Sequence, residues 1–448
     1  MIEFPKEFIW GASTAAYQIE GAVHEDGRGV SIWDTFSHTA GKVAGGDTGD
    51  VACDHYHRYR EDVSLMARLG IDAYRFSVAW PRVFPSGKGK PNRRGLDFYG
   101  RLVDELLERG IEPWVCLYHW DLPQALEDRG GWTARDTVHR FVDYAEVVAQ
   151  SLGDRVDNFL MLNEPSIVAV LGHLLGIHAP GRSDIAAYAA STHNLNLAAG
   201  QGVARLRELG NWRLGTVLNL EPVHGVGEGE QEQRVLTLYD AFRNRNYADP
   251  LFLGTYPEAT AAMMQPHVRD GDLEAIRQPL DMLGLNLYSR VRVKADPGSL
   301  VGFRQLDPPS GAQRTAMNWE VYPDALFQQL VELKERYGNP PVYVTENGAA
   351  FADRREPDGS VRDQQRIDFL AGYIGAVRRA LDSGVDVRGY FVWSLLDNFE
   401  WAEGYDKRFG LVYVDYRTQE RVTKASFDWY RETIRNKGFE PRDESEPV

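Results

Sequence analysis

Residues 58–80 read RYREDVSLMARLG-IDAYRFSVAW, and the two halves of this stretch differ in their hydrophobic periodicity. In the first half, apolar residues recur at helical spacing as far as Gly70, a residue type that suits a left-handed helix cap. The second half is a nearly continuous apolar run, which is typical of a parallel strand buried on both faces. The stretch therefore predicts a helix that leads into a buried strand.

This helix-then-strand pattern recurs along the chain, with Gly110, Gly210 and Gly384 as the predicted helix caps. Residues 96–120 read LDFYGRLVDELLERG-IEPWVCLYHW, residues 206–220 read LRELGNWR-LGTVLNL, and residues 377–397 read VRRALDSG-VDVRGYFVWSLLD. The predicted strands start near Phe8, Ala73, Pro113, Asn158, Leu214, Met282, Val342 and Gly389. Alternating strands and helices imply a parallel sheet with crossover connections.

Eight such units favour an α/β fold of one kind, a single closed (β/α)₈ TIM barrel whose long βα loops form an active-site mouth. The alternative is an open, doubly wound sheet, which would require a Gly-rich phosphate loop after the first strand. Residues 11–21, GASTAAYQIEG, lack that loop. Residues 1–448 are therefore predicted to form one catalytic domain. Residues 295–313 are predicted to be a long loop after the sixth strand, and residues 440–448 a frayed tail.

The composition excludes several classes of partner. Among 448 residues, 65 are acidic and 50 basic, giving a formal charge of -15, which repels nucleic acid and anionic membranes. No apolar stretch reaches membrane-spanning length, and the N-terminus does not resemble a signal peptide. The two cysteines, Cys53 and Cys116, fit a reducing compartment. We expect a cytoplasmic protein with no nucleic-acid or membrane partner; whether it forms a homo-oligomer stays open.

Two glutamates follow apolar runs. The fourth predicted strand ends in NFLMLNEP, residues 158–165, and the seventh in PVYVTENG, residues 341–348. The C-terminal ends of barrel strands meet at one mouth, so Glu164 and Glu346 should face a common pocket. Two facing carboxyls are the groups that cleave glycosides: one protonates the leaving oxygen, and the other acts as nucleophile or activates water.

Polar and aromatic side chains gather at the same predicted strand ends. His119 and Trp120 end the third strand, Trp393 ends the eighth, and Glu400 and Trp401 follow it. Sugars present both hydroxyl groups and apolar faces, and a pocket for them needs polar groups beside aromatic rings. Each of these residues alone is more simply a core or packing residue, but their joint placement favours a sugar site.

Other chemistries fit the sequence less well. His55 and His57 lack the partners of a zinc motif and are predicted to be structural. There is no G-x-S-x-G nucleophile elbow and no phosphate-binding P-loop. No metal and no cofactor are therefore expected.

Taken together, the motifs resemble those of glycoside hydrolase family 1, the retaining β-glucosidase family. The resemblance spans residues 8–430. It is carried, in family order, by FIWGASTAAYQIEGA (8–22), YHWDLPQALED (118–128), LNEP (162–165), HAPG (178–181), WEVYP (319–323), VYVTENG (342–348) and FVWSLLDNFEWAEGYDKRFGLVYVDY (391–416).

The resemblance implies a role for each matching residue. Glu346 would be the nucleophile, Glu164 the general acid/base, and Arg75 and Tyr288 the contacts of the nucleophile. The residues implied to bind the substrate are Gln18, His119, Trp120, Asn163, Asn286, Trp319, Trp393, Glu400, Trp401 and Phe409. Among them Asn163 would bind the 2-hydroxyl, Trp319 would carry the leaving group and Phe409 would close the pocket.

The resemblance also implies the substrate, a small-molecule β-glycoside or oligosaccharide. The expected reaction removes non-reducing terminal β-D-glucosyl residues from cello-oligosaccharides and from aryl or alkyl β-glucosides. Side activity on β-galactosides and β-fucosides, and transglycosylation, are also expected. Relatives that cleave phosphorylated sugars typically have Ser where this chain has Glu400, so a non-phosphorylated sugar is expected.

Four positions depart from the family pattern. Leu287 stands where Tyr is common, a minor change because the functional Tyr288 is retained. Asn246 and Ala248 stand where larger apolar residues are usual, and His173 stands where Tyr is common. These departures leave the predicted sugar-binding end intact. Two other functions remain open from sequence: a non-catalytic sugar-binding protein, which would not need an intact pair of glutamates, and a glycosyl-transferring enzyme, which would share the covalent intermediate.

Overall fold

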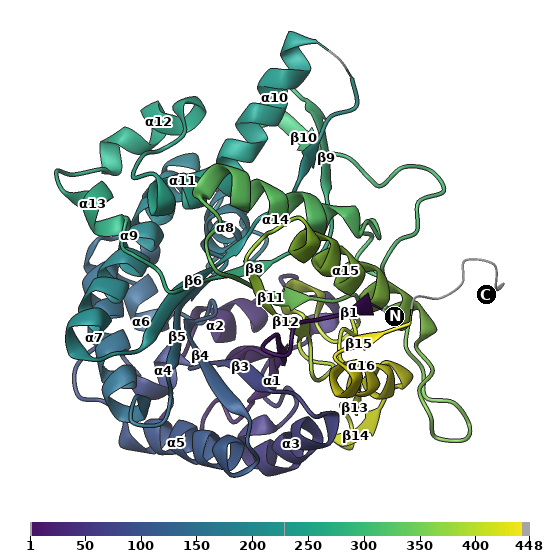
Figure 1. Cartoon of the computed structure of the whole chain (residues 1–448). Coiled ribbons are helices and arrows are strands. Elements are labelled where there is room, and N and C mark those ends of the chain that lie inside the picture. The colour runs from purple at the N-terminus through teal and green to yellow at the C-terminus, as the bar shows by residue number, and fades with distance from the viewer. Residues whose placement is uncertain (1, 228, 441–448) are drawn as a thin grey trace.

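A closed barrel of eight parallel strands forms the centre of the computed structural model, which describes residues 2–227 and 229–440 (Figure 1). In chain order the barrel strands are β2 (Ile9–Ser13), β3 (Ala73–Ser77), β4 (Glu112–Tyr118), β5 (Asn158–Asn163), β6 (Arg213–Asn219), β8 (Met282–Asn286), β11 (Val342–Asn347) and β12 (Val387–Trp393). Each pairs with the next, and β12 pairs with β2 to close the ring. The predicted (β/α)₈ barrel is confirmed. Residues 441–448 of the predicted frayed tail lie outside the described residues.

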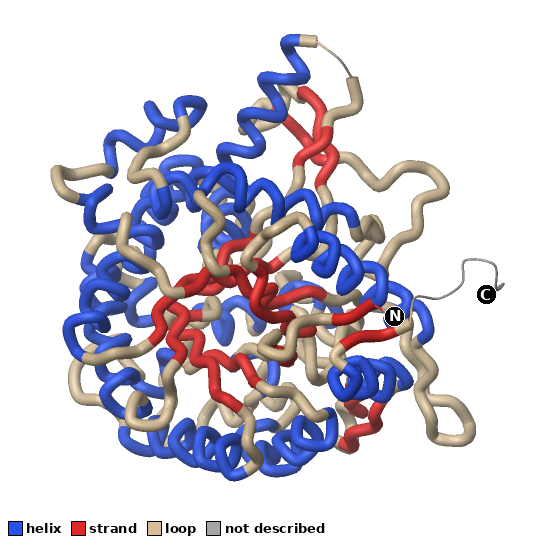
Figure 2. The backbone as a smooth tube through the Cα atoms, in the orientation of Figure 1, coloured by secondary structure: helices blue, strands red, loops and turns tan. Residues whose placement is uncertain are grey.

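Helices surround the barrel as an outer layer (Figure 2). The longer helices are α3 (His55–Leu69), α5 (Arg93–Glu108), α7 (Asp136–Leu152), α9 (Ile185–Leu209), α10 (Glu230–Asp240), α14 (Asp324–Tyr337), α15 (Gln364–Asp382) and α16 (Ala425–Asn436). Shorter helices are α1 (Ala16–Ile19), α2 (Ile32–Ser37), α4 (Trp80–Val83), α6 (Gln124–Glu127), α8 (Pro165–Ile167), α11 (Asn246–Phe252), α12 (Glu258–Met264) and α13 (Asp272–Ile276). This layer buries the outer face of every barrel strand.

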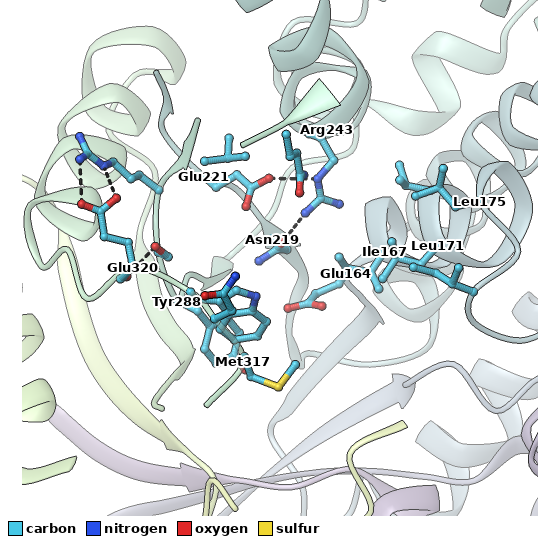
Figure 3. Close-up of a pocket in the computed structure, with 18 of the residues that line it drawn as sticks. Glu164, Ile167, Leu171, Leu175, Asn219, Glu221, Arg243, Tyr288, Met317 and Glu320 are labelled. Carbon is cyan, nitrogen blue, oxygen red and sulfur yellow. Dashed lines mark hydrogen bonds and ion pairs between the residues drawn. The ribbon is translucent and has the colours of Figure 1, made fainter. Parts of the chain in front are cut away.

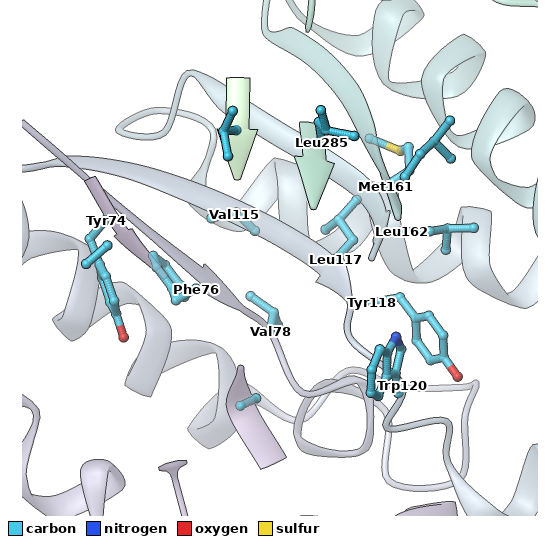
Figure 4. Close-up of a cluster of buried hydrophobic side chains, with 14 of the residues drawn as sticks. Tyr74, Phe76, Val78, Val115, Leu117, Tyr118, Trp120, Met161, Leu162 and Leu285 are labelled. Atoms are coloured by element: carbon cyan, nitrogen blue, oxygen red, sulfur yellow. The ribbon is translucent and has the colours of Figure 1, made fainter. Parts of the chain in front are cut away.

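The alternation of side chains along each strand divides the apolar residues between two cores. One face points into the barrel, where a compact cluster contains Trp114, Cys116 and Phe391. The other face points toward the helices, as Val115 and Leu117 of β4 do in Figure 4. Both faces of a barrel strand are thus buried, which explains why the strands read as continuous apolar runs.

Three of the four predicted glycine caps have the expected backbone. Gly70, Gly110 and Gly384 have positive φ angles of 82°, 70° and 76°. The prediction was wrong for Gly210, whose φ of -163° is extended. A Cβ at Gly210 would lie 2.8 Å from the ring of Trp212, so close packing rather than a left-handed turn requires glycine there.

The loops at the C-terminal ends of the strands are long and carry small sheets. After β8, strands β9 (Val291–Ala295) and β10 (Phe303–Gln305) join β7 (Val223–His224) in a three-stranded sheet beside α10. The stretch 295–313, predicted to be one long loop, therefore includes a short strand. Strands β13 (Val412–Asp415) and β14 (Glu420–Thr423) form a second small sheet, and β1 (Ile2–Glu3) pairs with β15 (Gly438–Phe439), which brings the described ends together.

Replacing Gly11 by alanine should destabilise the barrel. Gly11 lies in β2, and a Cβ there would come within 2.3 Å of the buried ring of Phe391. Overpacking of this kind costs about 1–3 kcal/mol, so the thermal unfolding midpoint should fall. Gly375→Ala is the matched control: Gly375 lies inside α15, and its Cβ would have an ordinary 3.9 Å contact with Ile2. The control should stabilise by about 0.5–1 kcal/mol; a fall in both variants would contradict the packing argument.

Candidate active site

A cavity of about 1280 Å³ opens at the C-terminal ends of the barrel strands (Figure 3). The residues predicted from sequence that line it are His119, Trp120, Glu164, Tyr288, Trp319, Glu346, Trp393, Glu400, Trp401 and Phe409. The remaining predicted residues, Gln18, Arg75, Asn163 and Asn286, are fully buried behind this lining and hydrogen-bond to it. The structure therefore brings every predicted site residue into one region.

Glu346 ends β11 and is held by two buried donors. Arg75, from β3, donates to Glu346 Oε1 over 2.6 Å, and the Tyr288 hydroxyl donates to Oε2 over 2.7 Å. Burial and the charge of Glu346 raise the pKa of Tyr288 well above its usual range, so Tyr288 is a neutral donor. The fixed pair of donors leaves Glu346 as an oriented carboxylate beside a cation.

Glu164 follows β5 in a left-handed conformation with φ of 47°, which turns the chain into α8. Its Oε1 accepts a hydrogen bond of 2.7 Å from Asn286 Nδ2. Burial, followed by the negative charge of Glu346, raises the pKa of Glu164 to about 8. At neutral pH Glu164 is therefore protonated, whereas Glu346 lies beside the Arg75 cation.

A chain of hydrogen bonds connects the two carboxyls. Arg75 donates to Asn163 Oδ1 over 2.5 Å, and Asn286 Nδ2 donates to the same oxygen over 3.0 Å. The amide of Asn163 bonds to Nε2 of His119 at 3.1 Å. Burial and the charge of Arg75 hold the pKa of His119 well below its usual range, so this ring is neutral. Its Nδ1 is buried and has no partner among the described residues.

Glu400 is a third carboxyl in the cavity. Gln18 approaches it with Nε2 at 3.4 Å from Oε2 and donates a shorter hydrogen bond of 2.8 Å to the carbonyl of Phe399. Burial, then the charges of Glu346 and Glu164, raise the pKa of Glu400 to about 8. A protonated carboxyl both donates and accepts hydrogen bonds, as a pair of sugar hydroxyls requires.

Aromatic rings form two groups around these polar residues. The ring of His119 is stacked near Trp393 and Trp401, each with a centroid distance of 5.9 Å. Farther out, Trp319 lies 6.1 Å from Phe409. Trp120 lines the cavity through its ring, while its indole N–H donates to the carbonyl of Asn163. The inner group surrounds the carboxyls with apolar faces suited to a sugar ring.

Hydrogen bonds and ion pairs of Asp397 hold the loop that carries Glu400, Trp401 and Phe409. The Asp397 carboxylate accepts hydrogen bonds from Lys424 Nζ (2.6 Å), the Gly410 amide (2.9 Å) and Arg408 (2.7 Å). Asp397 and Lys424 are both fully buried. This ion-pair cluster ties the two ends of the loop to β14 and α16.

Several residues of the site were missed from sequence. Thr345 of β11 donates to Asn286 Oδ1 over 2.7 Å, which fixes the amide that supports Glu164. Arg243 donates to Asn219 and Glu221 on the outer wall of the cavity (Figure 3). No local signal marks these polar residues. A further group, the aliphatic residues that follow Glu164, has helical spacing in the sequence and was identifiable from it.

His55 and His57, the two histidines considered above as metal ligands, are engaged with acidic residues. Buried His55 bonds to Asp62 at 2.8 Å, whereas exposed His57 bonds to Asp54 and Glu25. Among residues 2–227 and 229–440, no group of three or more His, Cys, Asp or Glu is arranged to hold a metal ion. No helix of that same part of the chain is long and apolar enough to cross a bilayer.

A closed parallel barrel with two carboxyls at its C-terminal mouth, ringed by aromatic residues, is the arrangement of a glycoside hydrolase. Comparison with known families matches residues 1–439 to Glycosyl hydrolase family 1. The chain belongs to this family, and the resemblance stated from its motifs is confirmed.

Individual relatives are similar over almost the whole length. Beta-glucosidase A of Thermotoga maritima is 47% identical over 98% of this chain and 99% of its own. A bifunctional beta-D-glucosidase/beta-D-fucosidase of Bifidobacterium breve is 48% identical over 96% of this chain and 98% of its own. The structure of the Thermotoga maritima beta-glucosidase in complex with deoxynojirimycin has a TM-score of 0.93 at 46% identity, covering 98% of this chain and all of that one.

Removing the charge of Asp397 should weaken sugar binding without touching the cavity. In Asp397→Asn the buried ammonium group of Lys424 loses one of the two carboxylates that balance its charge. The loop that carries Glu400 and Trp401 should then become less firmly held. We expect KM for a β-D-glucoside to rise about tenfold, equivalent to about 1.4 kcal/mol. The ratio of kcat/KM for β-D-glucoside over β-D-xyloside, which lacks the hydroxymethyl group, should fall.

The control for this prediction is Asp428→Asn, which removes a surface ion pair on α16 with Arg431. It should leave KM for the β-D-glucoside and the glucoside-to-xyloside ratio of kcat/KM unchanged. An Asp397→Asn protein that loses thermal stability but keeps its glucoside-to-xyloside ratio would show that the cluster is structural only.

Proposed function

We propose that the chain is a retaining exo-β-glucosidase in which Glu346 is the nucleophile and Glu164 the general acid/base. The observation that carries these roles is the unequal environment of the two carboxyls. Glu346 is paired with Arg75, whereas Glu164, with a pKa raised to about 8, accepts its supporting hydrogen bond from a neutral amide. The named activities of the relatives support the β-glucosidase class predicted from sequence, and family 1 glycosidases are retaining.

In the first step the protonated Glu164 donates to the glycosidic oxygen while Glu346 attacks the anomeric carbon. The C1–O bond to the leaving group breaks, and a C1–O bond to Glu346 forms. Arg75 and Tyr288 hold the attacking carboxylate in place before the reaction. The negative charge of Glu346 is consumed by the new bond, which removes one of the causes that raise the pKa of Glu164.

In the second step Glu164 is a carboxylate and acts as base for a water molecule. The water attacks C1 from the side the leaving group vacated, the ester to Glu346 breaks, and its carboxylate returns beside Arg75. Asn286 bonds to only one oxygen of Glu164, so the other oxygen is the one that carries the proton in the resting state. Two inversions give a product of β configuration.

The substrate we propose is a non-phosphorylated β-D-glucoside or cello-oligosaccharide. Glu400 occupies the inner cavity, where its protonated carboxyl donates to and accepts from hydroxyl groups but supplies no positive charge for a phosphate. The open outer cavity leaves room for leaving groups of varied size. Cys53 and Cys116 are both free and buried, which supports a cytoplasmic enzyme. The acidic excess supports the expectation that it has no nucleic-acid partner.

Glu346→Ala should abolish hydrolysis of 4-nitrophenyl β-D-glucoside, since the carboxylate that forms the covalent bond is removed. Added azide should restore turnover and yield the α-glucosyl azide, because the anion attacks the unprotected face once. For the native protein, proton NMR should show β-glucose as the first product. An α-configured first product would refute the double-displacement mechanism.

The basic limb of the pH profile should report Glu164. Its pKa is raised, so the catalytic proton is present at neutral pH and is lost as pH rises through about 8. We expect kcat/KM for an alkyl glucoside to fall above that pH. In Glu164→Gln, a dinitrophenyl glucoside, which needs no protonation, should react with kcat/KM independent of pH in this range.

Glu400 is the alternative source of that limb, because its pKa is also raised to about 8. If the limb persists unchanged in Glu164→Gln with the dinitrophenyl substrate, Glu400 is responsible and the assignment of Glu164 as the acid loses this support.

A further inference from the structure

A second, much smaller cavity lies between α1 and the turn that follows β4. Its volume is about 10 Å³, close to the smallest space that holds one water molecule. The polar side chains that line it are those of Tyr17, Glu20, Arg28 and Asp121. Each of these side chains is almost fully buried; that of Arg28 is 4% exposed. This space, called the Asp121 cavity below, is therefore enclosed by buried groups and contains several that are polar.

The carboxyl group of Asp121 lacks the partners that a buried polar group needs. Asp121 is 1% exposed, and within residues 2–227 and 229–440 neither Oδ1 nor Oδ2 has a hydrogen-bond partner. Burial, opposed in part by the charge of Arg28, raises the pKa of Asp121 to about 8, so its carboxyl is protonated at neutral pH. Folded proteins satisfy nearly all such groups, either with protein atoms or with an ordered water.

Glu20 is the second acidic side chain of the Asp121 cavity. Its Oε1 accepts a hydrogen bond of 2.7 Å from the Tyr99 hydroxyl, and its Oε2 accepts one of 2.6 Å from Arg82 Nε. A carboxylate has about four lone-pair positions, so Glu20 can still accept from a further donor. Tyr17 adds a hydroxyl, which bonds to Ser37 Oγ at 3.0 Å.

The ligand that suits this cavity is neutral and no larger than water. The guanidinium of Arg28 lines the cavity, and that of Arg82 is paired with Glu20, so two positive charges would repel a metal cation. The two acidic side chains disfavour an anion in the same way. A water molecule fits the volume and can accept one hydrogen bond while it donates another.

The Asp121 cavity lies between two segments that carry predicted sugar-binding residues. Asp121 directly follows His119 and Trp120, and the backbone of Trp120 is left-handed, with a φ of 80°. On the other side, Tyr17 belongs to α1 and directly precedes Gln18. A bridge across this cavity therefore connects the backbone segments on two sides of the sugar site.

We propose that the Asp121 cavity binds one water molecule, which bridges the carboxyl groups of Asp121 and Glu20. The water accepts a hydrogen bond from the Asp121 carboxyl and donates one to Glu20. The bridge holds the turn that carries His119 and Trp120 against α1, so Asp121 is a positioning residue for sugar binding. This positioning role rests on the proposed glucosidase function, whereas the water site does not.

A high-resolution crystal structure of the native chain tests the water site directly. We expect electron density for one water molecule that lies about 3 Å from an oxygen of Asp121 and about 3 Å from an oxygen of Glu20. Continuous absence of such density would overturn the proposal, because the carboxyl would then be buried with no partner of any kind.

The same crystal contains a matched control cavity. It has the same volume, about 10 Å³, and is lined mainly by apolar residues between α9 and β6, such as Leu195 and Leu218. Its polar side chains already have protein partners; they are Asn196, Thr216 and Tyr247. We expect this control cavity to be dry. Water density in both cavities would contradict the argument that the unpartnered carboxyl selects the water.

Two variants of Asp121 test the positioning role. Asp121→Asn keeps the shape and both donates and accepts hydrogen bonds, so water should stay and KM for 4-nitrophenyl β-D-glucoside should remain within about twofold of native. Asp121→Leu has a similar branched shape but no polar atom to bind water. We expect its KM to rise about tenfold, the effect of a weakened polar contact. Its kcat should change less, because neither Glu164 nor Glu346 lines the Asp121 cavity.

The outcomes separate the water bridge from other roles of Asp121. An equal rise of KM in both variants would assign the effect to the acidic group itself and overturn the bridge. A native KM in Asp121→Leu would overturn the positioning role. If Asp121→Leu does not fold, the native density and the KM of Asp121→Asn decide between these outcomes. A native protein that releases no nitrophenol would refute the proposed function, while the crystallographic test of the water site would still hold.

Discussion

The buried guanidinium of Arg75 is the constraint on which the site depends. It lies inside the barrel mouth with no exposure. Removing this charge from water costs free energy, which only an oppositely charged partner and hydrogen bonds can offset. Burial alone would lower the pKa of Arg75, but the adjacent charge of Glu346 outweighs it. One cation thus requires one anion at the end of β11, and the hydrogen bond to Asn163 also sets the position of the end of β5.

This pairing explains why three carboxyls of the inner cavity, Glu346, Glu164 and Glu400, differ. Arg75 compensates Glu346 directly. Glu164 and Glu400 receive the combined effect of burial and of the charge on Glu346, and the pKa of each rises to about 8. Chemically similar side chains are thereby divided by position into one that is paired with a cation and two whose pKa values are raised. The charges of Arg243 and Arg75 both act to lower the pKa of Glu164, but burial and the charge of Glu346 outweigh them.

The fold was largely predictable because its signal is local. Each barrel strand is a short apolar run after a helix, and the interior and exterior of the barrel both bury it, so strand starts were placed within two residues. Gly210 failed because its requirement is set by Trp212, a tertiary contact that no periodicity reveals. The strand at residues 303–305 was missed because its partner, β9, lies almost entirely before the stretch.

Within the site, the motifs identified the residues at strand ends but not their division of labour. Asn286 was predicted to bind substrate; the structure places it against Glu164 and Asn163, with Thr345 behind it. The roles of the catalytic residues remain predictions, as the geometry supports them without testing them. Arg243 and Asp397 act through partners distant in sequence, so only their three-dimensional arrangement shows what they hold.

The departures of this chain from its family pattern lie behind the leaving-group side, and the structure compensates for them. Asn246 is buried, donates to the Tyr188 hydroxyl and accepts from Thr260, so no polar group is left unpaired by the loss of an apolar side chain. His173 bonds to the Val168 carbonyl within the π-helix Val168–Leu174, and burial lowers its pKa to about 4, which keeps it neutral. The sugar end is fixed by charge pairing around Arg75, and the outer wall of the cavity has ion pairs of its own, Arg243 with Glu221 and Arg290 with Glu320. Because Asn246 and His173 are both neutral, these departures add no charge to either end.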